Sequence, residues 1–160
     1  MLTYRTGIGY DVHRFAKGRK LMLGGIEIPY ALGLQGHSDA DVLLHAICDA
    51  LLGAAGLGDI GEHFPPGDAR FKDISSSVLL SKVKEMLSKH GFKVGNVDVA
   101  VLAEEPHLRT YKIAMREHIA SVLEIPDLQV NIKATTNEGM GFVGRKEGIA
   151  AYATALLVRD

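Results

Sequence analysis

The order of helix-like and strand-like segments constrains the fold of this chain more than any other feature of its sequence. Helical spacing of apolar residues predicts three helices, and shorter apolar runs between turn residues predict five strands. The two kinds of segment are mixed without strict alternation, and a length of 160 residues suits one domain. We therefore expect a single-domain α+β sandwich over residues 1–160, in which helices cover one face of a mixed or antiparallel sheet.

The predicted elements leave two long glycine-rich loops, at residues 56–73 and 137–148. Ser38 is predicted to cap the first helix, with Asp41 as a shorter substitute for the glutamate of a capping box. The alanines of the last predicted strand would also permit a helix. The strands are predicted at residues 4–13, 20–30 (broken at Gly24-Gly25), 93–103, 128–136 and 149–158, and the helices at 39–55, 75–90 and 110–124.

Composition excludes several classes of protein. Hydrophobic residues make up 47% and charged residues 23%, the balance of a soluble globular domain. A net charge of -1 gives no argument for nucleic-acid binding, and the single cysteine, Cys48, excludes an internal disulfide framework. The sequence has no apolar run of membrane-spanning length and no signal-peptide pattern. We expect a cytoplasmic protein of bacterial type, unless a plastid targeting segment has been lost.

Three side chains near the start of the chain have the composition of a metal site. In the stretch GIGYDVHRF, Asp11 and His13 are two residues apart, so on a strand they share one face. On the first predicted helix, Asp41, His45 and Asp49 are four apart and form a polar stripe, whose carboxylates could orient the imidazole. Asp11, His13 and His45 would supply three ligands of a catalytic zinc ion with an open fourth position. The alternative is an exposed histidine and a turn aspartate, because Asp-x-His is a short and common pattern.

Two further segments are candidates for binding phosphate. His37 lies just before the first predicted helix, whose backbone amides could hold an anion, although it could also be an ordinary loop histidine. The stretch KATTNEGMGF, residues 133–142, offers free backbone N–H groups and threonine hydroxyls to phosphate oxygens, or is a plain glycine-rich turn. Glu138 in this stretch could bind a harder cation such as magnesium. The residues alone thus support a metal site beside a phosphate site without choosing a reaction.

Four stretches in this order carry a resemblance that runs from end to end: GIGYDVHRF, GHSDADVLLHAICDALLGAAGLGDIGEHFP, GNVDV and KATTNEGMGFVGRKEGIA. The chain closely resembles the 2-C-methyl-D-erythritol 2,4-cyclodiphosphate synthase family of the non-mevalonate isoprenoid pathway. The resemblance implies a phosphorus–oxygen lyase that acts on 4-diphosphocytidyl-2-C-methyl-D-erythritol 2-phosphate. In that reaction the 2-phosphate attacks the β-phosphorus, CMP leaves and a cyclic diphosphate forms.

The resemblance also implies residue roles. Asp11, His13 and His45 match zinc ligands, and Glu138 matches a position associated with magnesium or manganese. His37 and Thr136 match catalytic residues that orient the phosphates and stabilise the transition state. Ser38 and Asp49 match substrate-binding positions, and positions around the erythritol part match Asp59, Ile60, Gly61, Phe64, Pro65, Pro66, Gly67 and Asp68. Those of the cytidine pocket match Ala103, Glu104, Glu105, Pro106, His107, Leu108, Arg109, Ala134, Thr135 and Asn137.

The family assembles as a homotrimer, and a neighbouring subunit completes the cytidine pocket. The resemblance implies a central hydrophobic cavity that can hold an isoprenoid diphosphate, with Phe142, Arg145 and Glu147 at its polar mouth. Arginine suits a diphosphate by its geometry. The alternative for Arg145 and Glu147 is an ion pair between subunits.

This chain departs from the family pattern in two places. Asn137 stands where some relatives have a third threonine, and we expect little change because both side chains form hydrogen bonds. Glu104 and Glu105 add negative charge near an anionic ligand, so cytidine recognition is expected to use backbone groups there.

Two rival functions use the same residues. A zinc-dependent phosphodiesterase or hydrolase would have water as its nucleophile, and its products would be open-chain phosphates. A non-catalytic trimeric binder of isoprenoid diphosphates would hold a structural zinc ion, which a closed site with four ligands would favour.

Overall fold

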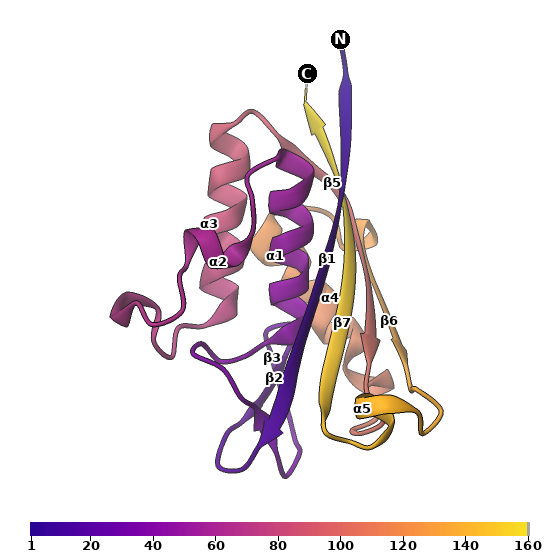
Figure 1. The fold of residues 1–160 in the computed structure, drawn as a ribbon. Coiled ribbons are helices and arrows are strands. Elements are labelled where there is room, and N and C mark those ends of the chain that lie inside the picture. The colour runs from indigo at the N-terminus through magenta and orange to yellow at the C-terminus, as the bar shows by residue number, and fades with distance from the viewer. Residues whose placement is uncertain (160) are drawn as a thin grey trace.

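The computed structural model describes residues 1–159 and shows a mixed five-stranded sheet with helices packed against it (Figure 1). The strands run in the order β4-β1-β7-β5-β6, and β2 and β3 form a separate hairpin. The strands are β1 (Thr3–Ala16), β2 (Leu21–Leu23), β3 (Ile26–Ile28), β4 (Gly33–Leu34), β5 (Lys93–Leu102), β6 (Val130–Thr135) and β7 (Gly148–Arg159). The helices are α1 (Val42–Ala55), α2 (Ile60–His63), α3 (Ser76–Lys89), α4 (Lys112–Leu123) and α5 (Gly141–Gly144), with 3-10 turns at Ala69–Phe71, Arg109–Tyr111 and Asp127–Gln129.

The first and last strands form the centre of the sheet. β1 pairs antiparallel with β7 from Thr3↔Arg159 to Arg14↔Gly148, and β5 pairs antiparallel with the other edge of β7. β6 runs parallel to β5, which makes the sheet mixed. The predicted α+β class is therefore confirmed, and the segment at 149–158 is a strand rather than a helix.

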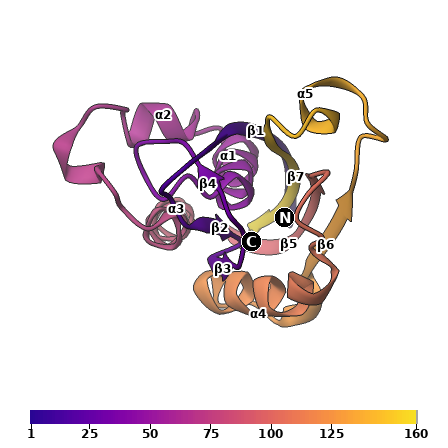
Figure 2. The same cartoon turned by 90° about the horizontal axis from the view of Figure 1, so that it is seen from below.

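The long helices lie on one face of this sheet (Figure 2). Helix α1 covers β1 and β7, α4 packs on β6, and α3 lies against both α1 and α4. The period of two along β5 buries Val97, Val99 and Val101 toward the helices, while Asn96 on the opposite face is exposed. This burial is the hydrophobic contribution that holds the two layers together.

Two glycines bring α1 unusually close to β1. A Cβ atom built on Gly9 would overlap the carbonyl oxygen of Ala46, and one on Gly7 would overlap that of Ala50. Since alternate residues of a strand share a face, Asp11 and His13 also face α1. The two glycines therefore set how closely the first turns of α1 approach Asp11 and His13 of β1.

The start of α1 differs from its prediction. The helix begins at Val42, and its cap is Asp41, not Ser38; the Asp41 side chain accepts the N–H of Leu44. The same buried carboxylate accepts the N–H groups of Gly24 and Gly25, which form the two-residue turn of the β2–β3 hairpin with φ of 60° and 77°. Asp41 is thus an interior link rather than part of an exposed polar stripe.

The predicted loops contain short elements that the pattern did not indicate. Residues 56–73 hold α2 and a 3-10 turn, residues 137–148 hold α5, and the two-residue strand β4 lies between the elements predicted at 20–30 and 39–55. Each is two to four residues long, too short to generate an apolar period. Within residues 1–159, no helix has the length and apolar character needed to cross a membrane.

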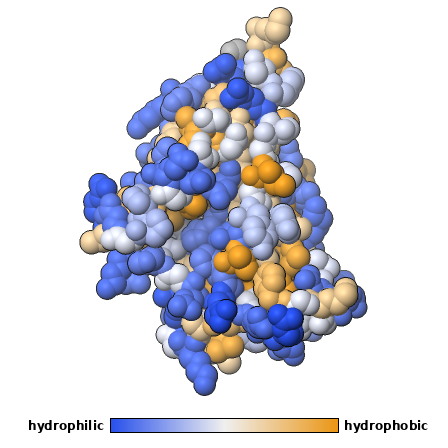
Figure 3. Space-filling view, in the orientation of Figure 1, coloured by the Kyte–Doolittle hydropathy of each residue, from blue (hydrophilic) through white to orange (hydrophobic). Residues whose placement is uncertain are grey.

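The face of the sheet that the helices leave open carries large apolar side chains. Ile8, Tyr10 and Val12 of β1 and Tyr152 of β7 are exposed, with Ile8 retaining 69% of its accessible surface. Orange apolar residues lie along the middle of the molecule in Figure 3, over these strands. Large apolar and aromatic side chains grouped on one surface in this way are typical of a surface that binds another molecule.

We predict that Gly9→Ala destabilises the fold by about 3 kcal/mol, because the new methyl group would force α1 away from the sheet. Denaturant unfolding monitored by circular dichroism measures the change. Gly53→Ala is the matched control, because Gly53 lies in α1 and an added Cβ would meet only the Ile8 carbonyl oxygen, at an ordinary contact distance of 3.9 Å; this variant should gain roughly 0.5–1 kcal/mol. Equal stabilities of Gly9→Ala and the unmodified protein would contradict the role given to this close contact.

Candidate metal centre and substrate clefts

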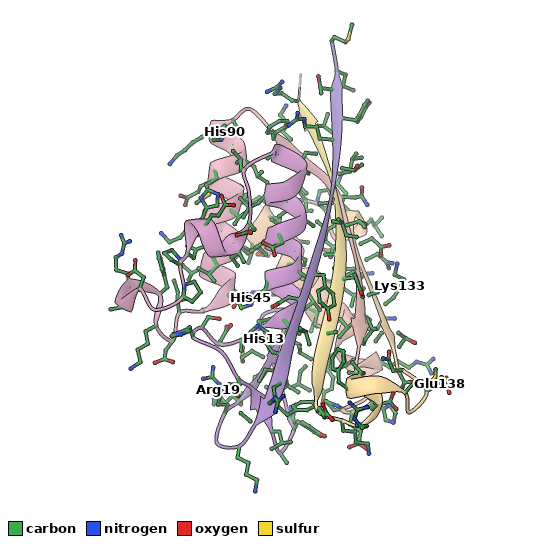
Figure 4. All side chains as sticks on the ribbon, in the orientation of Figure 1. His13, Arg19, His45, His90, Lys133 and Glu138 are labelled. Carbon is green, nitrogen blue, oxygen red and sulfur yellow. The ribbon has the colours of Figure 1, made fainter. Side chains whose placement is uncertain are left out.

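Asp11, His13 and His45 converge on one point between β1 and α1; the two histidines are labelled in Figure 4. Asp11 Oδ2 lies 2.9 Å from His13 Nε2 and 3.0 Å from His45 Nδ1, and the two ring nitrogens are 3.2 Å apart. Their side chains are largely but not fully buried, at 26%, 18% and 13% exposure. The structure therefore brings together the three side chains that the sequence analysis selected.

A backbone contact sets the orientation of the His13 ring. His13 Nδ1 lies 2.6 Å from the carbonyl oxygen of Gln35, which can only accept a hydrogen bond. Nδ1 must therefore carry the proton, and Nε2 points at Asp11 and His45. A protein carbonyl behind one ring nitrogen is the usual support for a histidine that binds a metal through the other.

The electrostatics of the site favour an ionised carboxylate. Burial opposes the charge of Asp11, but hydrogen bonds and attraction from His13 and His45 outweigh it and lower the pKa of Asp11 to about 2. Burial also opposes protonation of His13, yet the hydrogen bond and charge of Asp11 raise its pKa. In this arrangement the two imidazoles compensate the carboxylate, a role that a bound cation would take over.

The donor set fits a divalent transition metal. Two imidazole nitrogens and one carboxylate oxygen are the three protein ligands typical of a catalytic zinc site, which keeps a fourth position for a reactant. The group also borders a cavity of about 280 Å³, so a ligand in that cavity could reach the fourth position. The centre therefore has both the ligands and the access that chemistry on a bound anion requires.

The cavity beside the metal centre contains most of the residues predicted for the erythritol part. Its walls include Gly36, His37, Ser38, Ile60, Gly61, Phe64, Pro65, Pro66, Gly67 and Asp68. Phe71, Ile74 and Leu79 also line it and were not predicted, since an apolar residue in a wall has no chemical signal in a sequence. His37 and Ser38 lie here because the chain passes the metal centre just before α1 begins.

Asp49 and Asp59 do not line this cavity. Asp49 Oδ1 accepts the N–H of Ile60 at 2.8 Å, and Asp59 Oδ1 accepts that of Glu62 at 3.0 Å. Both carboxylates thus hold the first turn of α2 in place, and Ile60 and Gly61 of that turn form part of the wall. Their direct observed contacts are with the backbone that shapes the cleft.

A second cavity, of about 300 Å³, is lined by most of the residues predicted for cytidine, but not by Glu104, Glu105 or Asn137. The loop after β5 and the end of β6 meet there and contribute Ala103, Pro106, His107, Leu108, Arg109, Ala134, Thr135 and Thr136. Lys112, which the sequence analysis missed, adds a second cation beside Arg109. Thr136 therefore lies in a different cavity from His37, and Glu138 lies well away from His13 and His45 in Figure 4.

Glu104 and Glu105, whose negative charge departs from the family pattern, each have a partner within the chain. Glu104 Oε1 accepts the N–H of Asn137 at 2.6 Å, with a longer contact from Gly139 at 3.5 Å. Glu105 Oε1 pairs with Lys146 Nζ at 2.7 Å. Their charges are therefore partly compensated, and Glu104 links the loop after β5 to the loop after β6.

These contacts correct one expectation for residues 133–142. The N–H groups of Asn137 and Gly139 contact Glu104, and that of Glu138 donates to Thr136 Oγ1 at 3.3 Å. The prediction of free amides waiting for phosphate is thus wrong for these three. Arg145 and Glu147, expected at the mouth of a cavity or in an ion pair between subunits, pair within the chain at 2.7 Å.

Comparison with models of known protein families identifies the family of this chain. The model of the YgbB family matches residues 4–158. The chain belongs to the YgbB family. Among its relatives, the 2-C-methyl-D-erythritol 2,4-cyclodiphosphate synthase of Syntrophomonas wolfei is 59% identical over 153 residues, which cover 96% of this chain and 98% of that protein.

Solved structures share the fold. The bifunctional IspDF of Campylobacter jejuni matches with a TM-score of 0.96 and 44% identity, over 100% of this chain and 43% of that longer chain. A CDP complex of IspF from Plasmodium falciparum matches with a TM-score of 0.86 and 32% identity, over 98% of this chain and 97% of that chain. The second structure was determined with a cytidine nucleotide bound.

We predict that His45→Ala abolishes stoichiometric binding of zinc, because two ligands are left where three converge. The metal content of purified protein after dialysis measures this. His90→Ala is the control, since His90 lies at the end of α3 and, among residues 1–159, the hydrogen-bond partner of its side chain is the carbonyl oxygen of Met86. Unchanged zinc content in folded His45→Ala protein would contradict the ligand assignment.

Proposed function

We propose that this protein is a 2-C-methyl-D-erythritol 2,4-cyclodiphosphate synthase. It converts 4-diphosphocytidyl-2-C-methyl-D-erythritol 2-phosphate into 2-C-methyl-D-erythritol 2,4-cyclodiphosphate and CMP, in the non-mevalonate isoprenoid pathway. The observation that carries the proposal is the convergence of Asp11, His13 and His45 beside a cavity, in a chain 59% identical to a protein of that name. We further propose a cytoplasmic enzyme with one domain over residues 1–160.

The reaction is an intramolecular phosphoryl transfer. An oxygen of the 2-phosphate forms a bond to the β-phosphorus, the bond from that phosphorus to the CMP oxygen breaks, and CMP leaves with the electron pair. Because nucleophile and electrophile belong to one molecule, the protein has mainly to hold the substrate in its folded form and balance its charge. The cavity walls at Ile60 and Phe64–Asp68 would surround the erythritol part and exclude competing water.

Asp11, His13 and His45 would hold zinc or a similar divalent metal, and Glu138 would hold magnesium or manganese with the diphosphate. When bound, these ions supply Lewis-acid charge to the phosphate oxygens. His37 would orient the phosphates from the metal cavity, and the Thr136 hydroxyl would donate to phosphate oxygens from the nucleotide side. Arg109 and Lys112 add positive charge beside the predicted nucleotide.

We propose that the complete site forms in a homotrimer. Within one chain, His37 and Thr136 line separate cavities, so one substrate would meet both only if a neighbouring subunit supplied the second. The exposed apolar face of β1 and β7 would become buried in an interface between subunits. A central cavity between the sheets could hold an isoprenoid diphosphate, with Phe142 and Arg145 near its mouth.

Phosphorus NMR of the protein with the diphosphocytidyl substrate, zinc and magnesium tests the function. Resonances of CMP and a cyclic diphosphate are expected. Open-chain phosphates would instead identify a hydrolase, in which water attacks the same phosphorus. No turnover by zinc-loaded trimer would favour a non-catalytic binding protein.

We predict that Thr136→Ala retains zinc but lowers kcat about 100-fold, the usual cost of removing one donor to a transition-state oxygen. Thr136→Ser keeps the hydroxyl and should retain most of the activity. Steady-state kinetics and metal analysis of both variants measure the effects. A wild-type rate for Thr136→Ala would remove the hydroxyl from the mechanism.

We predict that Ile8→Arg dissociates the trimer and abolishes turnover without loss of zinc, because it places a charge in the apolar face opposite the metal centre. Sedimentation velocity and the cyclisation assay measure the two effects. Ile113→Arg is the control, since Ile113 is 61% exposed on α4 and should leave the assembly intact. An Ile8→Arg monomer with full activity would contradict the shared site.

A further inference from the structure

A chain of polar groups lies behind His45, on the side of the ring away from Asp11. His45 Nε2 is 2.9 Å from Ser76 Oγ, the first residue of α3, and the Ser76 hydroxyl is hydrogen-bonded in turn to Asp39 Oδ1. Ser76 is fully buried. Sequence analysis gave no role to Ser76 or Asp39, because the two are 37 residues apart and carry no motif.

The hydrogen positions in this chain follow from which groups can donate. An ionised carboxylate only accepts hydrogen bonds, so the single hydroxyl hydrogen of Ser76 must point to Asp39. Ser76 Oγ can then only accept from His45, and Nε2 must carry a proton. This arrangement leaves Nδ1, which faces Asp11 and His13, free to present its lone pair to a metal.

A second serine does not replace this contact. Ser38 Oγ lies 3.1 Å from His45 Nε2, slightly farther than Ser76, and already accepts the N–H of Ala40. Among residues 1–159, no carboxylate accepts the hydroxyl hydrogen of Ser38 as Asp39 accepts that of Ser76, so Ser38 could accept from or donate to the ring. Only the Asp39–Ser76 pair dictates one tautomer.

Asp39 is itself held in place by the backbone. Its Oδ2 accepts the N–H of Ser76 at 3.0 Å, its Oδ1 accepts that of Asp41 at 3.2 Å, and its own N–H donates to the carbonyl oxygen of Ile74. The carboxylate therefore joins the segment before α1 to the start of α3. The support behind His45 is part of the packing between these two helices, and it cannot rotate away independently.

We propose that Ser76 and Asp39 are positioning residues of the metal centre, which fix the Nε2–H tautomer of His45 and increase the basicity of Nδ1. The inference rests on the metal centre of the proposed function. Partners of this kind typically change metal affinity 10- to 100-fold when they are removed. The Gln35 carbonyl does the same for His13 through Nδ1, so both histidines are oriented from outside the ligand group.

The test is the zinc dissociation constant of the full-length protein, measured by competition with a chromogenic chelator. Ser76→Ala should weaken zinc binding 10- to 100-fold. Ser77→Ala is the matched control, because the neighbouring Ser77 also contacts a histidine, His118, at 2.7 Å but away from the metal centre. Its zinc affinity should stay within about twofold of the unmodified protein, and equal affinities for Ser76→Ala and Ser77→Ala would overturn the proposal.

A second measurement needs no variant. In the zinc-loaded protein, nitrogen-15 NMR of the histidine rings should show His45 with its proton on Nε2 and the metal on Nδ1. A proton on Nδ1 with metal on Nε2 would overturn the proposal even if Ser76→Ala failed to fold. Loss of zinc from His45→Ala together with an unchanged zinc affinity of Ser76→Ala would reject the positioning role of Ser76 and Asp39 and keep the metal centre, whereas retention of zinc by His45→Ala would reject the centre itself.

Discussion

The close contact of α1 with β1 is the interaction on which the site depends. Gly7 and Gly9 let the helix backbone approach the strand, and the same face of the strand continues into Asp11 and His13. Helix α1 begins beside these side chains, so His45 in its first turns meets them. One face of β1 thus carries both the glycines that pack against α1 and two candidate metal ligands, Asp11 and His13. A change in the position of the strand would therefore alter both the packing and the metal centre.

The surrounding charges are arranged so that few are left without a partner. The Asp11 carboxylate faces two imidazoles, Asp41 receives three backbone N–H groups, and Asp39 receives two together with the Ser76 hydroxyl. Burial raises the pKa of Asp41 despite these bonds. Carboxylates held by helix starts and turns give the metal centre rigid neighbours, because moving any of them would leave a buried charge unpaired.

The sequence predicted the long elements, because these depend on local periods, and it selected the three side chains that converge between β1 and α1. Alternation in β1 places Asp11 and His13 together, and helical spacing identifies α1 and α3 as helices. The sequence did not predict features that depend on contacts between residues far apart in the chain. Asp41 rather than Ser38 caps α1 because the β2–β3 hairpin supplies two further donors, and Ser76 lies behind His45 only once α3 packs on α1. Glu104 likewise contacts amides of a loop more than thirty residues away.

The central claim is that one divalent metal binds between β1 and α1, and anomalous diffraction at the zinc absorption edge tests it most directly. Crystals of the zinc-loaded protein should give one strong anomalous peak per chain, bonded to Asp11 Oδ2, His13 Nε2 and His45 Nδ1. A peak at another group of side chains, or none at these three, would contradict the account.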